Sequence, residues 1–200
     1  MTVRELAVPG AWEITPRQHA DSRGLFFEWF TEAAFEAFTG HEFDLRQANC
    51  SVSAAGVLRG LHFAQLPPSQ AKYVTCVRGS VFDVVVDIRV GSPTFGQWDS
   101  VLLDDRERRT IYLSEGLGHA FLALEDHSTV MYLCSAGYDP EREHTIRVTD
   151  LGIDWPDTHE LILSDRDAAA PTLDEVRAAG LLPTWAETQA FVAELRDRAR

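Results

Sequence analysis

The chain is almost devoid of lysine: among its 18 basic residues only Lys72 is a lysine, and the rest are arginines. Acidic residues outnumber basic ones by 31 to 18, which gives the 200-residue chain a formal charge of −13. A field of this sign repels polyanions such as nucleic acids and anionic membranes. Both are therefore excluded as partners, and any anionic ligand requires a local cluster of cations.

Long hydrophobic runs are also missing. No stretch reaches the roughly 18 uninterrupted apolar residues of a membrane span, and residues 1–17 lack the basic and apolar regions of a signal peptide. We therefore expect a cytoplasmic protein.

Cysteine is scarce, with Cys50, Cys76 and Cys134 odd in number and widely spaced in apolar surroundings. This pattern favours buried, reduced thiols over disulfides or a zinc site.

Motifs for common cofactors and nucleophiles are absent. The sequence has no phosphate-binding P-loop, no dinucleotide-binding glycine fingerprint and no G-x-S-x-G elbow. His62, His119 and His127 lack the closely spaced histidine partner with which barrel-type sites usually hold a metal. We therefore expect no cofactor and no metal, although a metal-dependent barrel remains an alternative.

Short strands fill the middle of the chain. Alternation is clearest in residues 81–90, where one face is apolar and the other carries Asp83, Asp87 and Arg89. Turn residues separate the strands at intervals of about 8 to 12 residues, which favours an antiparallel sandwich or barrel. The other predicted strands are 56–63, 72–79, 97–103, 109–113, 119–124 and 129–135.

Helices are predicted only at the flanks. Thr31 is a candidate N-cap for residues 31–38, and Thr172 for a helix that stops at Gly180. Residues 186–200 form a last amphipathic helix, with Phe191, Val192 and Leu195 on one side.

Two residues of one strand suggest chemistry. Period two places Arg59 and His62 on opposite faces, but Gly60 between them is typical of a bulge that turns both inward. A strand histidine is more often structural than catalytic, yet the adjacent arginine and the following proline-rich loop weigh towards function. That loop leads to Lys72, whose compact ammonium suits a developing oxyanion.

His119 and Tyr132 fall on neighbouring strands joined by a short turn, while Asp165 and Asp167 flank Arg166 in a predicted loop, where solvated turn residues are the default reading. These groups supply acids, bases and cations without a cofactor. They are the equipment for removing a proton next to a carbonyl, because the substrate's ketone delocalises the negative charge.

Several linked motifs resemble one family. RGLHF followed by PP, Q-x-K, RGSVFDVVVDIRVGSPTFGQW, EGLGHAFLAL, LGIDWP and LSDRDAAAPTL occur in this order between about Asp21 and Leu182. Together they resemble the dTDP-4-dehydrorhamnose 3,5-epimerase family, in particular epimerases of antibiotic deoxysugar pathways.

The resemblance implies a mainly β protein, a cupin-like jelly roll (double-stranded β-helix) with short flanking and C-terminal helices. Residues 1–200 form one domain, in which strands within 1–50 are exchanged in a homodimer and the C-terminal helices occupy 172–200. The implied activity is cofactor-independent epimerisation of a dTDP-4-keto-6-deoxyhexose at C3 and C5.

Site roles follow by matching motifs. His62 corresponds to the general base, Asp167 to the carboxylate that orients it, Lys72 to the cation at the 4-keto oxygen, and Tyr132 to the acid that reprotonates the opposite face. The substrate-binding positions are Arg23, Phe26, Glu28, Gln47, Asn49, Arg59, Asp83, His119, Tyr138 and Arg166.

Two further alternatives stay open. A mono-epimerase of the same fold would act at C3 only or at C5 only. A non-catalytic sugar-nucleotide-binding jelly roll would need the cations but would have no use for both His62 and Tyr132.

Overall fold

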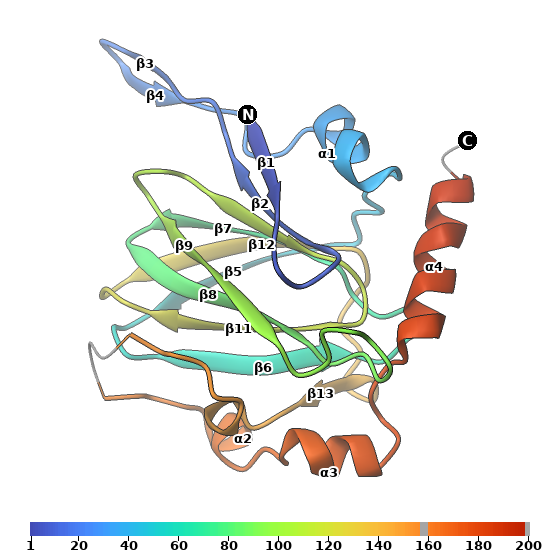
Figure 1. The fold of residues 1–200 in the computed structure, drawn as a ribbon. Helices are drawn as coiled ribbons and strands as arrows, with labels where there is room; N and C mark the ends of the chain where they lie inside the picture. Colours follow the sequence, from blue (N-terminus) through green and yellow to red (C-terminus); the bar gives the residue numbers. More distant parts are fainter. Residues whose placement is uncertain (157–159, 199–200) are drawn as a thin grey trace.

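Two antiparallel sheets face each other and form the body of the molecule (Figure 1). The six-stranded sheet has the order β1-β2-β10-β7-β12-β5, and the five-stranded sheet has the order β13-β6-β11-β8-β9. The structure is a computed structural model that describes residues 1–156 and 160–198. The expected mainly β jelly roll is confirmed.

The strands lie between residues 2 and 145. They are β1 (Thr2–Glu5), β2 (Ala11–Thr15), β3 (His19–Asp21), β4 (Gly24–Phe26), β5 (Gln47–Ser53), β6 (Leu58–Ala64), β7 (Lys72–Arg78), β8 (Ser80–Asp87), β9 (Trp98–Asp104), β10 (Thr110–Leu113), β11 (Leu117–Ala123), β12 (Ser128–Cys134) and β13 (Glu143–Thr145). The seven predicted strands correspond to β6 to β12, with ends that differ by at most three residues.

The helices lie at the flanks, as predicted. They are α1 (Glu32–Thr39), a short 3₁₀ turn η1 (Val148–Asp150), α2 (Asp165–Ala168), α3 (Leu173–Ala178) and α4 (Trp185–Arg198). Thr172 caps α3 with a full capping box, and Gly40 ends α1 in the left-handed conformation. The last predicted helix ran to 200, and residues 199–200 lie outside the described residues. Among the helices described, none is both long and apolar enough to cross a membrane.

Asp165 and Asp167 depart from the prediction, because they lie in α2 rather than in a loop. The Ser164 side chain accepts a hydrogen bond from the Asp167 amide and so caps this single turn. One turn is too short to show a periodic apolar pattern, so residues 165–168 carry no helical signal.

Three apolar clusters hold the sheets and helices together. One lies between the two sheets and includes Val74, Val85 and Val130. A second covers the outer face of the five-stranded sheet, where α3 and the segment around Trp155 pack. A third, largely aromatic, cluster centres on Phe35 of α1. Both faces of the five-stranded sheet are thus buried.

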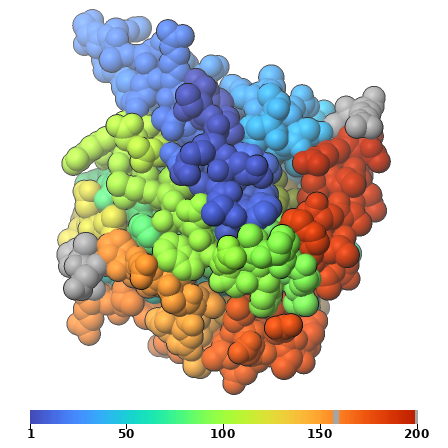
Figure 2. Space-filling model, viewed as in Figure 1, coloured from blue at the N-terminus to red at the C-terminus, as the bar shows by residue number. Residues whose placement is uncertain are grey.

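A two-stranded hairpin, β3–β4, stands apart from this body. Figure 1 shows it projecting from one end of the sandwich, and Figure 2 shows it standing clear of the remaining surface. Phe26 at its end is 67% exposed, and Leu25 beside it is 43% exposed. Exposed apolar side chains on a projecting hairpin are typical of a contact with a second molecule.

The cysteine prediction was correct for two of three residues. All three thiols are free, but Cys50 is exposed whereas Cys76 and Cys134 are buried. Cys50 lies on β5, the last strand of its sheet, and alternation turns it outward together with the exposed Val52.

Charged residues of β8 and the following turn are buried. Arg89 is 1% exposed and donates to both carboxylate oxygens of Asp87, at 2.8 and 2.7 Å. Burial by itself would raise the pKa of Asp87, but hydrogen bonds from Arg89, Ser92 and Thr94 outweigh it and lower that pKa. The guanidinium also lies over the Trp185 ring at 4.6 Å, which ties α4 to the sheet.

Replacing Asp87 with alanine would leave the Arg89 guanidinium buried without its carboxylate. We expect the free energy of unfolding to fall by about 3–5 kcal/mol, measured by chemical denaturation. Glu194→Ala is the control, because the Glu194–Arg198 pair is exposed on both sides and its loss should cost less than about 0.5 kcal/mol. Equal, small losses in both variants would contradict this assignment.

Candidate active site

The β6–β11 pairing brings two histidines side by side. His62 and His119 are register partners, and three residues of β6 span the same stretch as two of β11 between there and the Arg59–Phe121 pair. A bulge therefore lies at Gly60, where φ is +112° and an added Cβ would lie 2.5 Å from the His119 carbonyl oxygen. The predicted bulge is confirmed, and it puts His62 and Arg59 on the same side.

Each histidine is bound to a carboxylate. His62 Nε2 lies 2.8 Å from Asp167 Oδ1, and His119 Nε2 lies 2.9 Å from Asp83 Oδ1. Because an ionised carboxylate only accepts, His62 carries its proton on Nε2 and keeps the lone pair on Nδ1. Burial would raise the pKa of Asp167, but the hydrogen bonds from His62 and Ser164 lower it overall, which keeps the carboxylate ionised.

Lys72 approaches from the other sheet, at the start of β7. Its ammonium forms no hydrogen bond or ion pair with any residue in the described ranges. Burial lowers the pKa of Lys72, and the nearby charges of Glu143 and Asp83 oppose that effect. An ammonium between the sheets without a fixed partner is available to an oxygen of a bound molecule.

Tyr132 lies on β12, next to β7 in the same sheet, and pairs in register with Asn49 of β5. Burial raises the pKa of Tyr132, so its hydroxyl stays protonated at neutral pH. Cys134 follows two residues later on the same face and accepts a hydrogen bond from Asn49 Nδ2 at 3.7 Å. Gln47 in turn donates to Asn49 Oδ1 at 2.8 Å, which extends this polar row along β5.

The two sheets therefore present different chemistry to the space between them. The five-stranded sheet carries the His62–Asp167 and His119–Asp83 pairs, and the six-stranded sheet carries Lys72. Asp83 is completely buried, and burial raises its pKa although His119 and Lys72 act against this. The charged face that alternation predicted for residues 81–90 lies in the interior rather than on the surface.

Two arginines stand at the mouth. Arg59 and Arg166 line a cavity of about 370 Å³ together with His62 and Asp167. Arg59 Nε donates to Ser53 Oγ, and Arg166 donates one N–H to the Glu143 carbonyl. Their remaining donors face an opening next to the histidine, where an anionic group can be held.

The remaining predicted binding residues lie further away. Arg23 pairs with Asp21 on the projecting hairpin, and Phe26 and Glu28 are exposed on or just after it, so the chain does not bring these three to its own His62. Tyr138 is 57% exposed, but its backbone N–H donates to Gln47 Oε1, which places it at the rim.

Glu143 is a site residue that the sequence did not reveal. It pairs with Ala64 while Thr145 pairs with His62, so alternation turns Glu143 to the same face as His62. Its charge acts on Lys72, Tyr132 and Cys134. The surrounding residues 139–144 are so polar that they read as a solvated loop, and only the pairing with β6 brings Glu143 to the site.

No group of three or more metal-binding side chains is found within residues 1–156 and 160–198. The arrangement offers instead a base, an acid, an ammonium and a cationic mouth.

Known proteins share this sequence and architecture. Residues 5–175 match the family model described as dTDP-4-dehydrorhamnose 3,5-epimerase. A protein of that name from Mycolicibacterium smegmatis is 76% identical over 196 residues, which cover 98% of each chain. The solved rmlC epimerase of Mycobacterium tuberculosis is 72% identical with a TM-score of 0.97, over 98% of this chain and 100% of that one.

A solved 3'-monoepimerase from Streptomyces bikiniensis, in complex with dTDP-quinovose, is 49% identical with a TM-score of 0.93, over 96% of this chain and 98% of that one. The family expected from the sequence motifs is confirmed: the chain belongs to the dTDP-4-dehydrorhamnose 3,5-epimerase family, a family of carbohydrate isomerases.

Proposed function

We propose that this protein epimerises a dTDP-4-keto-6-deoxyhexose at C3 and C5 without a cofactor. The observation that carries the proposal is the placement of a histidine–aspartate pair and a tyrosine on opposite sheets, with an unpartnered ammonium between them. The relatives named above act on or bind dTDP-sugars, which supports the substrate class.

His62 acts as the base in this proposal. Its Nδ1 lone pair takes the proton from the carbon next to the ketone, and Asp167 stabilises the imidazolium that forms. The short hydrogen bond between the two also fixes the orientation of the ring. A base held in one tautomer keeps its Nδ1 lone pair available for the proton of the substrate.

Lys72 stabilises the enolate that proton removal creates. Negative charge builds up on the former 4-keto oxygen, and an ammonium without a competing partner can bind it. A well-placed donor of this kind contributes about 3–4 kcal/mol to lowering the barrier.

Tyr132 returns a proton to the opposite face of the carbon. Inversion requires that acid and base lie on opposite sides of the sugar ring, and a ring held between the two sheets meets this requirement. His119 and Asp83 keep the polar interior beside Lys72 hydrogen-bonded.

The nucleotide end of the substrate lies at the mouth and beyond. Arg59 and Arg166 bind the diphosphate, while Gln47, Asn49 and Tyr138 contact the nucleotide side. We further propose that a second copy supplies Arg23, Phe26 and Glu28 through its β3–β4 hairpin, which makes the protein a homodimer. The exposure of Leu25 and Phe26 on β4 supports this, because apolar side chains left open to solvent favour contact with a second molecule.

A cytoplasmic location is part of the proposal. All three cysteines are free, as is typical of proteins in a reducing compartment.

Epimerisation at C3 alone is the second candidate. The 3'-monoepimerase from Streptomyces bikiniensis has the same fold at 49% identity, so this fold supports reaction at one carbon as well as at two. The two candidates share the same base and differ in which carbons come within its reach.

Incubation with dTDP-4-keto-6-deoxyglucose in deuterated water tests the proposal. We expect deuterium at both C3 and C5, read by NMR, because each inversion passes through an enolate that exchanges its proton. His62→Ala should abolish exchange at both carbons with little loss of binding, whereas His127→Ala, a change at an exposed turn, should retain it.

Label at C3 alone would establish the mono-epimerase instead. A substrate that binds without any exchange would show a non-catalytic sugar-nucleotide-binding protein, and undiminished exchange in His62→Ala would refute the base assignment.

The role proposed for Lys72 predicts where kcat falls at high pH, which is the alkaline limb of its pH profile. Only the protonated ammonium donates to the enolate, so activity is full below the pKa of Lys72 and is lost as the pH rises through it. Burial lowers this pKa, so we expect the limb below the ordinary value of about 10.4. In Lys72→Arg the limb should move upward, because guanidinium stays charged. An unmoved limb would assign it to another group.

The exchanged hairpin predicts complementation between two defective variants. We expect His62→Ala and the double variant Arg23→Ala/Phe26→Ala each to be impaired alone. Co-expressed in equal amounts, they should regain about one quarter of wild-type activity, since half of the dimers then contain one intact site. If the hairpin serves its own chain, activity will not rise above that of the separate variants.

A further inference from the structure

We propose that Glu115 is a positioning residue for Lys72: its buried carboxyl fixes the start of β7 from the side of the sheet opposite the site. This inference rests on the catalytic role proposed above for Lys72. Glu115 lies in the turn between β10 and β11 and does not reach the histidines or the tyrosine.

Lys72 lies at the end of its strand, where the regular strand pairing stops. It is the first residue of β7, and its partners Leu113 and Cys134 are the last residues of β10 and β12. Beyond these pairs the ladder ends. Since no described side chain holds the ammonium, its place between the sheets depends on where the backbone of residues 71–72 lies.

A serine bridge connects that backbone to Glu115. Ser135 Oγ accepts the Ala71 N–H at 2.8 Å and donates to Glu115 Oε1 at 2.9 Å. The Ser135 N–H also donates to the Ala71 carbonyl at 3.1 Å. With its own proton committed to Glu115, the serine oxygen keeps its lone pairs turned towards Ala71, so the carboxyl orients the bridge.

The residue after Glu115 also holds the loop that precedes Lys72. The Gly116 N–H donates to Ser69 Oγ at 2.9 Å, and Ser69 Oγ donates to the Ala64 carbonyl at 3.1 Å. Gln70 Nε2 donates to the Ala136 carbonyl at 2.9 Å. Residues 69–71 are therefore held by hydrogen bonds from two other segments immediately before Lys72.

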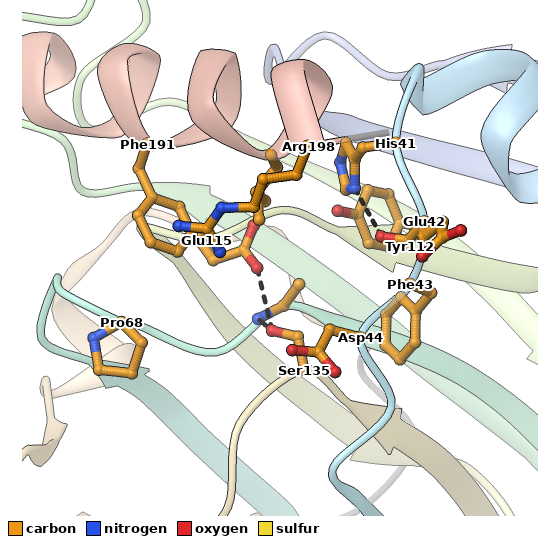
Figure 3. Close-up of a pocket in the computed structure, with 12 residues that line it drawn as sticks. His41, Glu42, Phe43, Asp44, Pro68, Tyr112, Glu115, Ser135, Phe191 and Arg198 are labelled. Carbon is orange, nitrogen blue, oxygen red and sulfur yellow. Dashed lines mark hydrogen bonds between the residues drawn. The ribbon is translucent and has the colours of Figure 1, made fainter. Parts of the chain in front are cut away.

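Packing on the same side is interrupted next to this backbone, although Ala71 itself belongs to the cluster around Phe35. A cavity of about 240 Å³ lies against Ala71, Ser135 and Glu115, between the end of the sandwich and α4. Figure 3 shows Glu115 and Ser135 meeting beneath the helix, with Phe191 and Arg198 projecting from it. Where a cavity replaces packed atoms, dispersion contacts are lost, so the hydrogen bonds contribute more to fixing the backbone.

A carboxyl at this position is costly, which argues that it has a role. Glu115 is 3% exposed, burial raises its pKa, and its second oxygen has no partner among the described residues. Arg198 lines the same cavity, but its ion pair is with Glu194. An apolar residue would avoid the desolvation cost, but it would lose the bond to Ser135 and the interactions with the backbone N–H groups of Ala71 and Glu115.

Steady-state kinetics with dTDP-4-keto-6-deoxyglucose test the inference. We expect Glu115→Ala to lower kcat by about 10- to 100-fold with KM within about threefold of wild type, because a displacement near 1 Å at a catalytic group costs up to about 100-fold. Glu115→Gln should restore kcat to within about threefold, since its amide oxygen still accepts from Ser135.

Ser135→Ala removes the same bridge from the other end and should reproduce the loss even if Glu115→Ala fails to fold. Leu195→Ala, which enlarges the cavity from α4 outside this network, is the matched control and should leave kcat unchanged. If Glu115→Ala and Ser135→Ala retain wild-type kcat, or if Glu115→Gln is as impaired as Glu115→Ala, the inference is overturned. A wild-type protein that shows no deuterium exchange would instead refute the proposed function.

Discussion

A carboxylate buried between two sheets must be matched by hydrogen-bond donors, and this requirement organises the molecule around β8. Asp87 meets it at one end through Arg89, Ser92 and Thr94, which build the turn into β9. Asp83 meets it at the other end through His119 of the adjacent strand. The first group stabilises the fold, and the second keeps the polar interior of the candidate site in order.

The same constraint explains why Lys72 can remain uncommitted. The negative charges nearest to it are Asp83 and Glu143, and Asp83 is already occupied by His119. An ammonium close to carboxylates but not bonded to them still has donors free, and the carboxylates oppose the lowering of its pKa by burial. That state depends on the backbone beneath it, which is why the serine bridge to Glu115 matters to a group that it does not touch.

Because the two sheets face each other, side chains from each sheet can approach opposite faces of a bound ligand. In the proposed mechanism the base enters from the five-stranded sheet and the acid from the six-stranded sheet, so a flat ligand between them meets one on each side. The cavity under α4 belongs to neither face of this arrangement, and its walls include the back of the strands that carry the chemistry. A site can therefore be affected by residues that never contact its ligand.

Local patterns in the sequence predicted much of the scaffold. Alternation located β6 to β12 to within three residues, because side chains of neighbouring positions on a strand face opposite ways. Gly60 predicted the bulge, since few other residues adopt its φ of +112°. The family motifs identified His62, Asp167, Lys72 and Tyr132, and the structure places all four around the space between the sheets.

Other features have no local signature. Cys50 was expected to be buried, but it faces outward because β5 is the last strand of its sheet. Glu143 reaches the site through the pairing of β13 with β6, and Glu115 is linked to Ala71 by Ser135, 20 residues away in sequence. Neither the strand pairing nor the serine bridge can be predicted from the residues next to Glu143 or Glu115 in the sequence.

The sequence by itself determined the periodicity, the turns, the bulge, the family and the candidates for acid, base and cation, because each depends on a few adjacent residues or on linked motifs. Only the tertiary structure decided which charges are buried together, which face of β8 meets Lys72 and what holds that lysine in place. These depend on contacts between distant segments, whose geometry is set by the packing of one sheet on the other.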